Sequence, residues 1–258
     1  MLLSRTSRIG VIALALLAIA AGGSNLAGQD IDAREIVRRA NDLARGLNSY
    51  STASMQIVRP TWTREMAMTS WSLGTDYYMI LITAPARDKG QVFLKRENDM
   101  WNWVPRIQRS VKIPPSMMNQ SWMGSDFTNN DLVRIDSLVI DYTQEIIGEE
   151  TMEGYETYEV ELMPLPEAPV VWGRVALWIA KVEYFMLRAE YYDEDGELIN
   201  RLTAGEVKLL DDREIPTRMV MEDAKKPGHQ TIMITETADF HIDVDESFFS
   251  QQQMRTVR

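Results

Sequence analysis

The spacing of apolar and polar residues changes near residue 50, and the part before it has the spacing of a helix. Asp32 and Glu35 form a helix-capping arrangement. The apolar residues that follow recur at helical intervals: Ile36, Val37, Ala40, Leu43, Ala44 and Leu47. Gly46 and Asn48 close the element, so the pattern predicts one amphipathic helix. Its other face carries Arg34, Arg38, Arg39 and Arg45, and is either a solvated face or a docking surface.

From Tyr50 onward the chain consists of short runs rich in β-branched and aromatic residues, each bounded by turn formers. These runs predict strands at Tyr50–Val58, Arg64–Leu73, Tyr77–Thr83, Gln91–Arg96, Met100–Val104, Leu138–Ile147, Tyr155–Met163, Arg174–Ala180, Phe185–Tyr192, Leu198–Leu210, Ile215–Glu222 and Thr231–His241. Most connections have the length and composition of hairpin turns. The sequence therefore predicts a mainly β protein whose antiparallel meander closes toward a barrel or a sandwich.

Alternation along two of these strands indicates what covers them. In Tyr155–Met163 we expect Tyr158, Val160 and Leu162 to face inward, while the glutamates mostly face outward, as in a sheet with one buried face. In Arg174–Ala180 both faces are apolar, so we expect that strand to be covered on both sides. The proline-rich stretch Pro164–Pro169 between them is expected to be a loop over a cavity mouth rather than a linker between domains.

The segment Met100–Leu132 combines several Trp and Met residues with cations. Its first part has strand alternation, and Pro114 and Pro115 then end any strand ladder because proline lacks a backbone donor. Ser116–Trp122 can form a short helical turn. Two interpretations remain open: a core strand with a covering turn, or a flexible Met and Trp surface that adapts to a ligand.

Methionine is abundant, with 16 residues, and several lie at period two on predicted strands. Because methionine has loose rotamers, it specifies core packing poorly and suits irregular or adaptable surfaces. These side chains either fill gaps in the core or line a concave face that is held open.

Composition excludes some classes of function. A net charge of -11 argues against nucleic acid as a partner, since phosphate binding needs clustered Lys and Arg. The chain has no cysteine, which excludes disulfides, thiolate catalysis, cysteine metal sites and a lipidated N-terminal cysteine.

The N-terminus has the pattern of a secretory signal. Arg5 and Arg8 precede an apolar run from Ile9 to Ala21, and small residues follow through Gly28. The run is shorter than the roughly 20 apolar residues of a spanning helix, which favours a cleaved signal over an uncleaved anchor. We therefore expect residues 1–28 to be a signal peptide, with the cleavage site not fixed, and residues 29–258 to form a single domain.

Catalytic and metal-binding motifs are scarce. The chain has only two histidines and no G-x-S-x-G elbow, which argues against a histidine-dependent hydrolase. His241 with Asp239, Asp243 and Asp245 can be arranged as a metal site, but acids at period two on a final strand are more often solvent-facing. We predict no enzyme activity, no metal and no cofactor, although two carboxylates without a signature would suffice for glycoside hydrolysis.

The residues Trp101–Pro105, Ile113–Met118, Gln120–Phe127 and Asp131–Leu132 resemble the outer-membrane lipoprotein-sorting family, the LolA-like proteins. The resemblance is to the branch whose members accompany inner-membrane transporters, and it extends from about Ile31 to Phe249. It implies a curved antiparallel sheet forming a half-open β-barrel around an apolar cavity, with short helices as a lid. It also implies transport of lipid or lipidated protein through the periplasm.

The resulting functional hypothesis is a periplasmic carrier, or chaperone, for the acyl chains of lipoproteins or lipids, acting from the inner toward the outer membrane. The alternative is a lipid-sensing or accessory subunit of an inner-membrane transporter that carries no cargo. Implied partners are acyl chains and an ABC or RND type transporter, with transient membrane contact and a monomeric state. The candidate cavity residues are Met66, Met68, Trp71, Trp101, Trp103, Met117, Met118, Trp122, Trp178, Met219 and Met221.

Overall fold

The structure is a computed structural model, and it describes residues 32–46, 48–133 and 136–258. The predicted signal peptide, residues 1–28, lies outside the described residues, as does Leu47 of the predicted helix. Among the described residues no helix is both long and apolar enough to cross a membrane.

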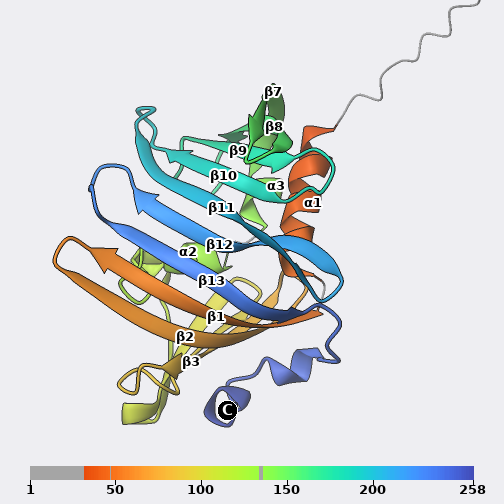
Figure 1. Ribbon diagram of the computed structural model, residues 1–258. Coiled ribbons are helices and arrows are strands. Elements are labelled where there is room, and N and C mark those ends of the chain that lie inside the picture. Colours follow the sequence, from red (N-terminus) through yellow and green to blue (C-terminus); the bar gives the residue numbers. More distant parts are fainter. Residues whose placement is uncertain (1–31, 47, 134–135) are drawn as a thin grey trace, which may run out of the picture. The chain divides into compact units, whose positions relative to one another are not determined.

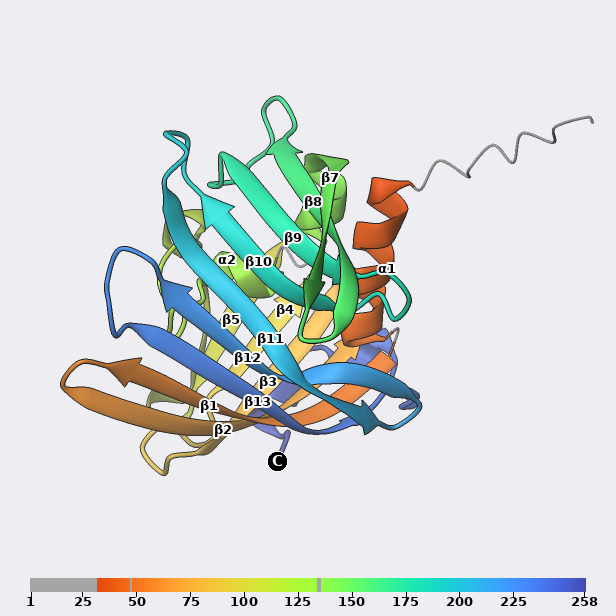
Figure 2. The same cartoon turned by 45° about the horizontal axis from the view of Figure 1, so that its top comes forward.

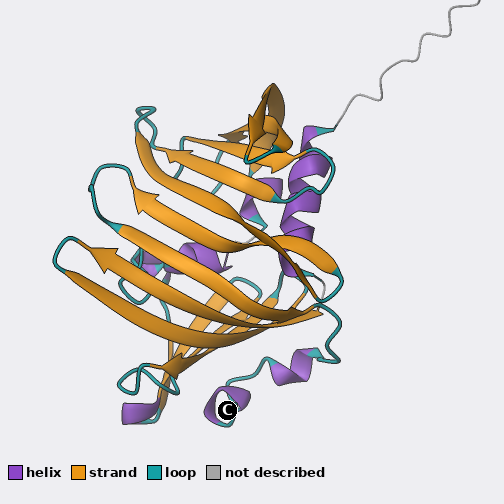
Figure 3. Cartoon of the chain, viewed as in Figure 1, coloured by secondary structure: helices purple, strands orange, loops and turns teal. Residues whose placement is uncertain are grey.

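A single antiparallel sheet dominates the fold (Figures 1 and 3). Its strands are β1 (Asn48–Arg59), β2 (Trp62–Leu73), β3 (Tyr77–Ala84), β4 (Val92–Arg96), β5 (Asp99–Val104), β6 (Arg109–Lys112), β7 (Tyr142–Met152), β8 (Tyr155–Pro164), β9 (Arg174–Ala180), β10 (Met186–Tyr192), β11 (Leu198–Leu210), β12 (Arg213–Asp223) and β13 (Gln230–Asp239). Their order across the sheet is β6-β5-β4-β3-β2-β1-β13-β12-β11-β10-β9-β8-β7.

This order describes two meanders joined in the middle. The first runs outward from β1 to β6, the second runs back from β7 to β13, and β13 then pairs with β1. The edges β6 and β7 do not pair with each other, so the curved sheet stays open along one side (Figure 2). The predicted half-open barrel is confirmed.

Helix α1 (Ala33–Arg45) packs against the β7–β9 end of the sheet (Figure 2). Asp32 caps it by accepting a hydrogen bond from the backbone N–H of Arg34 at 3.0 Å. Ile36, Val37 and Ala40 of its apolar stripe are buried against α3 (Ser137–Ile140) and the strands, as the sequence pattern predicts, whereas Ala44 near its end is exposed. Since most of the stability of a short amphipathic helix comes from such packing, the sheet holds α1 in place.

The remaining helical elements are short: α2 (Asn129–Val133) and the 3-10 turns η1 (Pro105–Ile107), η2 (Pro115–Met117), η3 (Glu246–Phe248) and η4 (Gln253–Arg255). The turn predicted after Pro115 is therefore present, in a shorter form. Strand β6 was not predicted, and residues 138–140 form α3 rather than the start of a strand. A run of three apolar residues fits either period, and the side-chain amide of Gln144 donates to the carbonyls of Leu138 and Val139, which satisfies the end of the helix.

The two faces of the sheet are covered differently. On the concave face, the first meander packs its side chains around Trp122, and the second packs against α1 and α3. On the convex face, the C-terminal residues cover a second apolar cluster. Phe249, Met254 and Val257 of this segment lie over strands β2–β5.

Candidate functional site

The topology requires one long crossing. The chain leaves β6 at one edge and enters β7 at the other, and the residues between them lie across the open, concave side of the sheet. We call residues 113–133 and 136–141 the crossing segment. It contains α2 and α3, and both contribute side chains to a cavity that the sheet encloses from the other side. The crossing segment therefore occupies the position of a lid.

The cavity between the crossing segment and the sheet has a volume of about 340 Å³. That is more than ten times the ~30 Å³ that a water molecule occupies in the liquid. Its wall is mostly apolar and comes from five regions: the end of α1, the crossing segment, the first residue of β7, the loop before β9, and strands β10–β13. The lining residues are Arg45, Trp122, Phe127, Thr128, Asn130, Asp131, Leu132, Ser137, Leu138, Tyr142, Val170, Val171, Trp172, Met186, Tyr191, Leu202, Met219, Met221 and Met233.

Four methionines form a row across the concave face. Met66 of β2 is paired in register with Met55 of β1, Met55 with Met233 of β13, and Met233 with Met219 of β12. Residues paired in this way have Cβ atoms about 5 Å apart, so their side chains are neighbours. Met66 and Met55 are buried under the crossing segment, whereas Met233 and Met219 face the cavity. The row gives the cavity a floor that can re-pack around ligands of different shape.

A second cavity, of about 180 Å³, lies between α1 and the sheet. Leu138, Met186 and Met219 line both cavities. Apart from Asn41 and Thr235 its lining is apolar, and it includes Val37, Ala40, Leu43 and Ala44 of α1. The two hollows are therefore separated by side chains alone, two of which are unbranched thioethers that change rotamer easily.

A buried ion pair fastens the crossing segment to the sheet. Arg59 Nη1 at the end of β1 lies 2.9 Å from Asp126 Oδ2, and the two side chains are only 11% and 8% exposed. Asp126 Oδ2 also accepts a hydrogen bond from Thr231 Oγ1 of β13 at 2.7 Å. Arg59 Nη2 donates to the carbonyl of Gly124, and Arg64 of β2 donates to the carbonyl of Met123. Side chains from three strands thus hold the loop at Met123–Asp126 in one position.

The structure distributes the candidate cavity residues over both faces. Met219, Met221 and Trp122 line the main cavity. Met66, Met68 and Met118 lie on the same face, packed in the cluster around Trp122, while Met117 on the crossing segment is 42% exposed. Trp122 is fully buried and makes an edge-on contact with Phe93, at 5.4 Å between ring centroids. Acyl-chain contact itself stays a prediction for all of them.

Four candidate tryptophans lie on the convex face. Trp71, Trp101 and Trp103 pack in the cluster covered by the C-terminal segment, and Arg255 stacks over the Trp103 ring at 5.5 Å. Trp178 projects from β9 on the side opposite Leu177 and Ile179, under the guanidinium of Arg188. The alternation of the sequence correctly placed Trp101 and Trp103 on one face of their strand. It could not show whether that face was the concave or the convex one, because apolar residues cover both faces of these strands.

Sequence reasoning did not select several residues that line the cavity. Met186 and Tyr191 belong to β10, whose predicted strand gave no indication of which face was inward. Trp172 follows the proline-rich loop and packs on Tyr191 at 5.3 Å between ring centroids. The expectation that this loop covers a cavity mouth did point to its position. Arg45 was placed with the other arginines of α1 on the outer face, and the structure corrects that: its side chain lines the cavity.

Burial changes the acid-base properties of the few polar groups in the cavity. Burial raises the pKa of Tyr191. Asp131 also lines the cavity, and desolvation raises the pKa of its carboxyl group although the residue is exposed at the surface. Burial lowers the pKa of Arg45 to about 10, so that its guanidinium remains cationic at neutral pH. The cavity is thus an apolar space with one cation and one acid in its wall.

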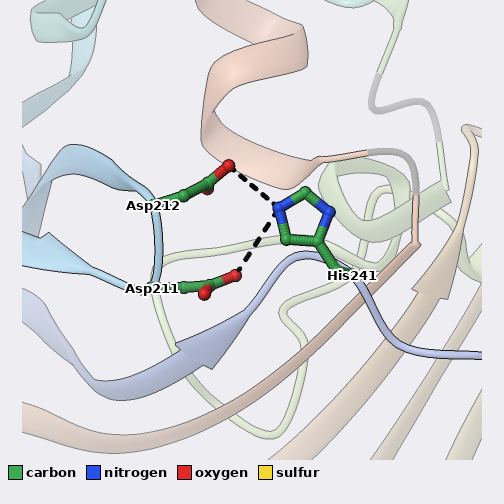
Figure 4. A group of neighbouring side chains, drawn as sticks. All are labelled: Asp211, Asp212 and His241. Carbon is green, nitrogen blue, oxygen red and sulfur yellow. Dashed lines mark hydrogen bonds and ion pairs between the residues drawn. The ribbon is translucent and has the colours of Figure 1, made fainter.

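A separate group of acids surrounds His241 at the end of β13 (Figure 4). Its Nε2 lies 2.9 Å from Asp212 Oδ2 and 3.9 Å from Asp211 Oδ2, both in the β11–β12 turn. The hydrogen bond and charge of Asp212 raise the pKa of His241. Asp212 also forms an ion pair with Arg213, and Asp211 accepts a hydrogen bond from the backbone N–H of Phe240. These contacts join the residues after β13 to the β11–β12 turn, and they account for the exposed cluster without a metal ion.

Two of the three aspartates considered from sequence for a metal site, Asp239 and Asp245, have other roles. Asp239 accepts a hydrogen bond from the backbone N–H of His241, and Asp245 caps η3 through the N–H of Ser247. Such short-range bonds are ordinary turn and cap contacts of aspartate.

Comparison with solved structures defines the class of fold. A DUF1329 family protein from Desulfovibrio piger superposes with a TM-score of 0.78 at 25% identity, over 86% of this chain and 97% of that one. A domain from Vibrio parahaemolyticus assigned as an outer membrane lipoprotein-sorting protein gives 0.75 at 22% identity, over 86% and 98%. A LolA superfamily protein from Nitrosomonas europaea gives 0.72 at 21% identity, over 86% and 99%. The LolA-like fold implied by the sequence resemblance is therefore confirmed.

The sequence model of one protein family, described as "Uncharacterized protein", matches residues 74–256, and the chain belongs to that family. No curated protein matches the chain at a significant level.

Proposed function

We propose that this protein is a non-enzymatic periplasmic carrier that binds acyl chains of lipids or lipoproteins in the cavity beneath the crossing segment. The observation that supports this most is the cavity of about 340 Å³ with a methionine-lined floor. Its volume falls within the 300–1,000 Å³ of typical ligand sites, and its wall is mainly apolar with few polar groups. The solved relatives include a protein assigned to outer membrane lipoprotein sorting.

The energetics of acyl burial are sufficient for such a role. Each methylene group that leaves water contributes about 0.8 kcal/mol, so eight methylenes contribute about 6 kcal/mol before ordering costs. A carrier must also release its cargo, and a floor of adaptable methionines favours many poses over one tight fit. Methionine rather than rigid aromatic residues on β12 and β13 agrees with that need.

The alternative hypothesis is a lipid-sensing or accessory subunit of an inner-membrane transporter that does not move cargo. The buried ion pair of Arg59 and Asp126 favours neither function, since a crossing segment held in this way could cover either cargo or a regulatory ligand. The transporter partner, the monomeric state and export by residues 1–28 remain predictions from the sequence.

The two functions differ in whether the protein speeds transfer between membranes. We expect purified protein to accelerate transfer of a fluorescently labelled phospholipid from donor to acceptor vesicles. Met219→Trp fills the point where the two cavities meet and is expected to reduce transfer toward the spontaneous rate. Met163→Trp is the matched control, because Met163 is 46% exposed, and it should transfer normally.

The outcomes separate the alternatives. Acceleration that Met219→Trp abolishes supports a carrier that uses this cavity. Binding of the lipid without any acceleration favours the accessory subunit, and equal transfer by all three proteins would contradict use of the cavity. Overpacking costs about 1–3 kcal/mol, so a thermal melt of Met219→Trp shows whether it is folded.

A further inference from the structure

Arg45 is an arginine in the cavity wall that forms no ion pair with another described side chain. It lies in the last turn of α1, partly buried, and its side chain lines the cavity. Within residues 32–46, 48–133 and 136–258 its guanidinium makes no hydrogen bond or ion pair. Two arginines on the outer face of the same helix are paired: Arg38 with Glu35 and Asp42, and Arg39 with Glu35.

An unpaired guanidinium in an apolar wall is costly. A charge removed from water must be compensated by a partner, and a charge left alone is destabilising. The nearby acids do not supply a contact. Asp42 is engaged with Arg38, and Asp136 acts on Arg45 only through its charge at longer range. The carboxylate of Asp131, which lines the same cavity, accepts hydrogen bonds from the backbone N–H and hydroxyl of Thr128.

The surroundings of Arg45 specify the missing partner. The protein has a net charge of -11, so its surface as a whole disfavours anions and a local cation is needed to hold one. Arginine binds carboxylate and phosphate through paired N–H donors, and these charge-assisted bonds are among the strongest in proteins. The cavity that Arg45 lines is also lined by Met219, Met221 and Met233, whose side chains suit hydrocarbon.

From this arrangement we infer that the cavity selects amphiphiles with a single anionic head, a carboxylate or a phosphate, whose head group is bound by Arg45 while the hydrocarbon tail lies on the methionine floor. This inference rests on the proposed lipid-binding function and narrows its ligand class. Asp131 in the same wall disfavours a second negative charge and limits the site to heads of low charge.

The test uses lipid-free protein and the uncharged fluorescent probe N-phenyl-1-naphthylamine, which any apolar cavity takes up. Dodecanoate, dodecyl phosphate and methyl dodecanoate compete for the probe. We expect at least one of the two anions to displace it at about tenfold to hundredfold lower concentration than the neutral ester, the range that a hydrogen-bonded charge contributes. Which anion binds better distinguishes a carboxylate head from a phosphate head.

Two variants assign the preference to Arg45. Arg45→Met should remove the advantage of the anions and leave displacement by the ester unchanged, while Asp131→Asn should increase it. Arg34→Met, the same substitution at an exposed position of α1, is the control and should behave like the original protein. Arg45→Met should melt no lower than the original lipid-free protein, because it removes an unpaired charge.

The outcomes keep the two proposals apart. Equal displacement by all three competitors, or an anion preference that survives in Arg45→Met, would overturn the inference and leave lipid binding intact. Failure of the probe and all three competitors to bind would instead contradict the proposed function. A marked fall in the melting temperature of lipid-free Arg45→Met would show that the residue stabilises the fold, and would also overturn the inference.

Discussion

Replacing Asp126 with alanine is expected to lower the free energy of unfolding by about 3–5 kcal/mol, measured by urea denaturation. The substitution leaves the guanidinium of Arg59 buried without its carboxylate and removes the acceptor of the Thr231 hydroxyl. Both losses occur where the crossing segment is held against β1 and β13. The same variant should therefore also loosen the lid, which hydrogen exchange of residues 122–131 would detect.

The control for this prediction is an ion pair of similar geometry at the surface. Asp99 lies 2.6 Å from Lys112, and their side chains are 47% and 54% exposed. Exposed pairs contribute about 0–1 kcal/mol, so Asp99→Ala should have a small effect. If the two variants lose the same amount of stability, the buried pair is not the fastening of the crossing segment.

Phe249→Ala is expected to have an effect of similar size on the opposite face, about 3–5 kcal/mol. Phe249 is fully buried between the C-terminal segment and the sheet, with Tyr77 and Phe248 rings at 5.7 and 5.3 Å between centroids. Its removal leaves a cavity under the segment that covers Trp71, Trp101 and Trp103. A melt of this variant, beside Leu209→Ala at a position 66% exposed, checks the prediction.

This variant also separates the two faces in function. Because Phe249 lies on the convex side, Phe249→Ala should still bind N-phenyl-1-naphthylamine at temperatures where it is folded. Loss of probe binding in the folded variant would mean that the convex cluster, with its three tryptophans, takes part in binding after all.

Local pattern was enough to predict the strands and the helix because each element carries its own signal. Alternation in β8 identified Val160 and Leu162 as inward, and both are fully buried. Ile36, Val37 and Ala40 of the α1 stripe are buried as expected. Turn residues placed most hairpins. The open barrel followed from many short strands together with the family resemblance.

Long-range pairing was not predictable from these signals. The register of β1, β2, β12 and β13 is what brings four methionines into one row: Met55, Met66, Met219 and Met233. The sequence of a single strand does not determine its register with a strand distant in the chain. The same holds for Arg45, whose position at the end of α1 puts it at the boundary between the outer face and the cavity. Helical spacing assigns Arg45 to the polar face of α1. Its position at the cavity follows from the crossing segment, which the sequence did not place.

The central claim is that the cavity beneath the crossing segment holds hydrocarbon. Denaturing mass spectrometry of the protein purified from cells, with its lipid extracted and identified, tests it most directly. We predict that lipid is retained, that it includes species with an anionic head, and that Met219→Trp carries much less of it than Met163→Trp. Protein that emerges free of lipid, or equal lipid content in the two variants, would contradict the account.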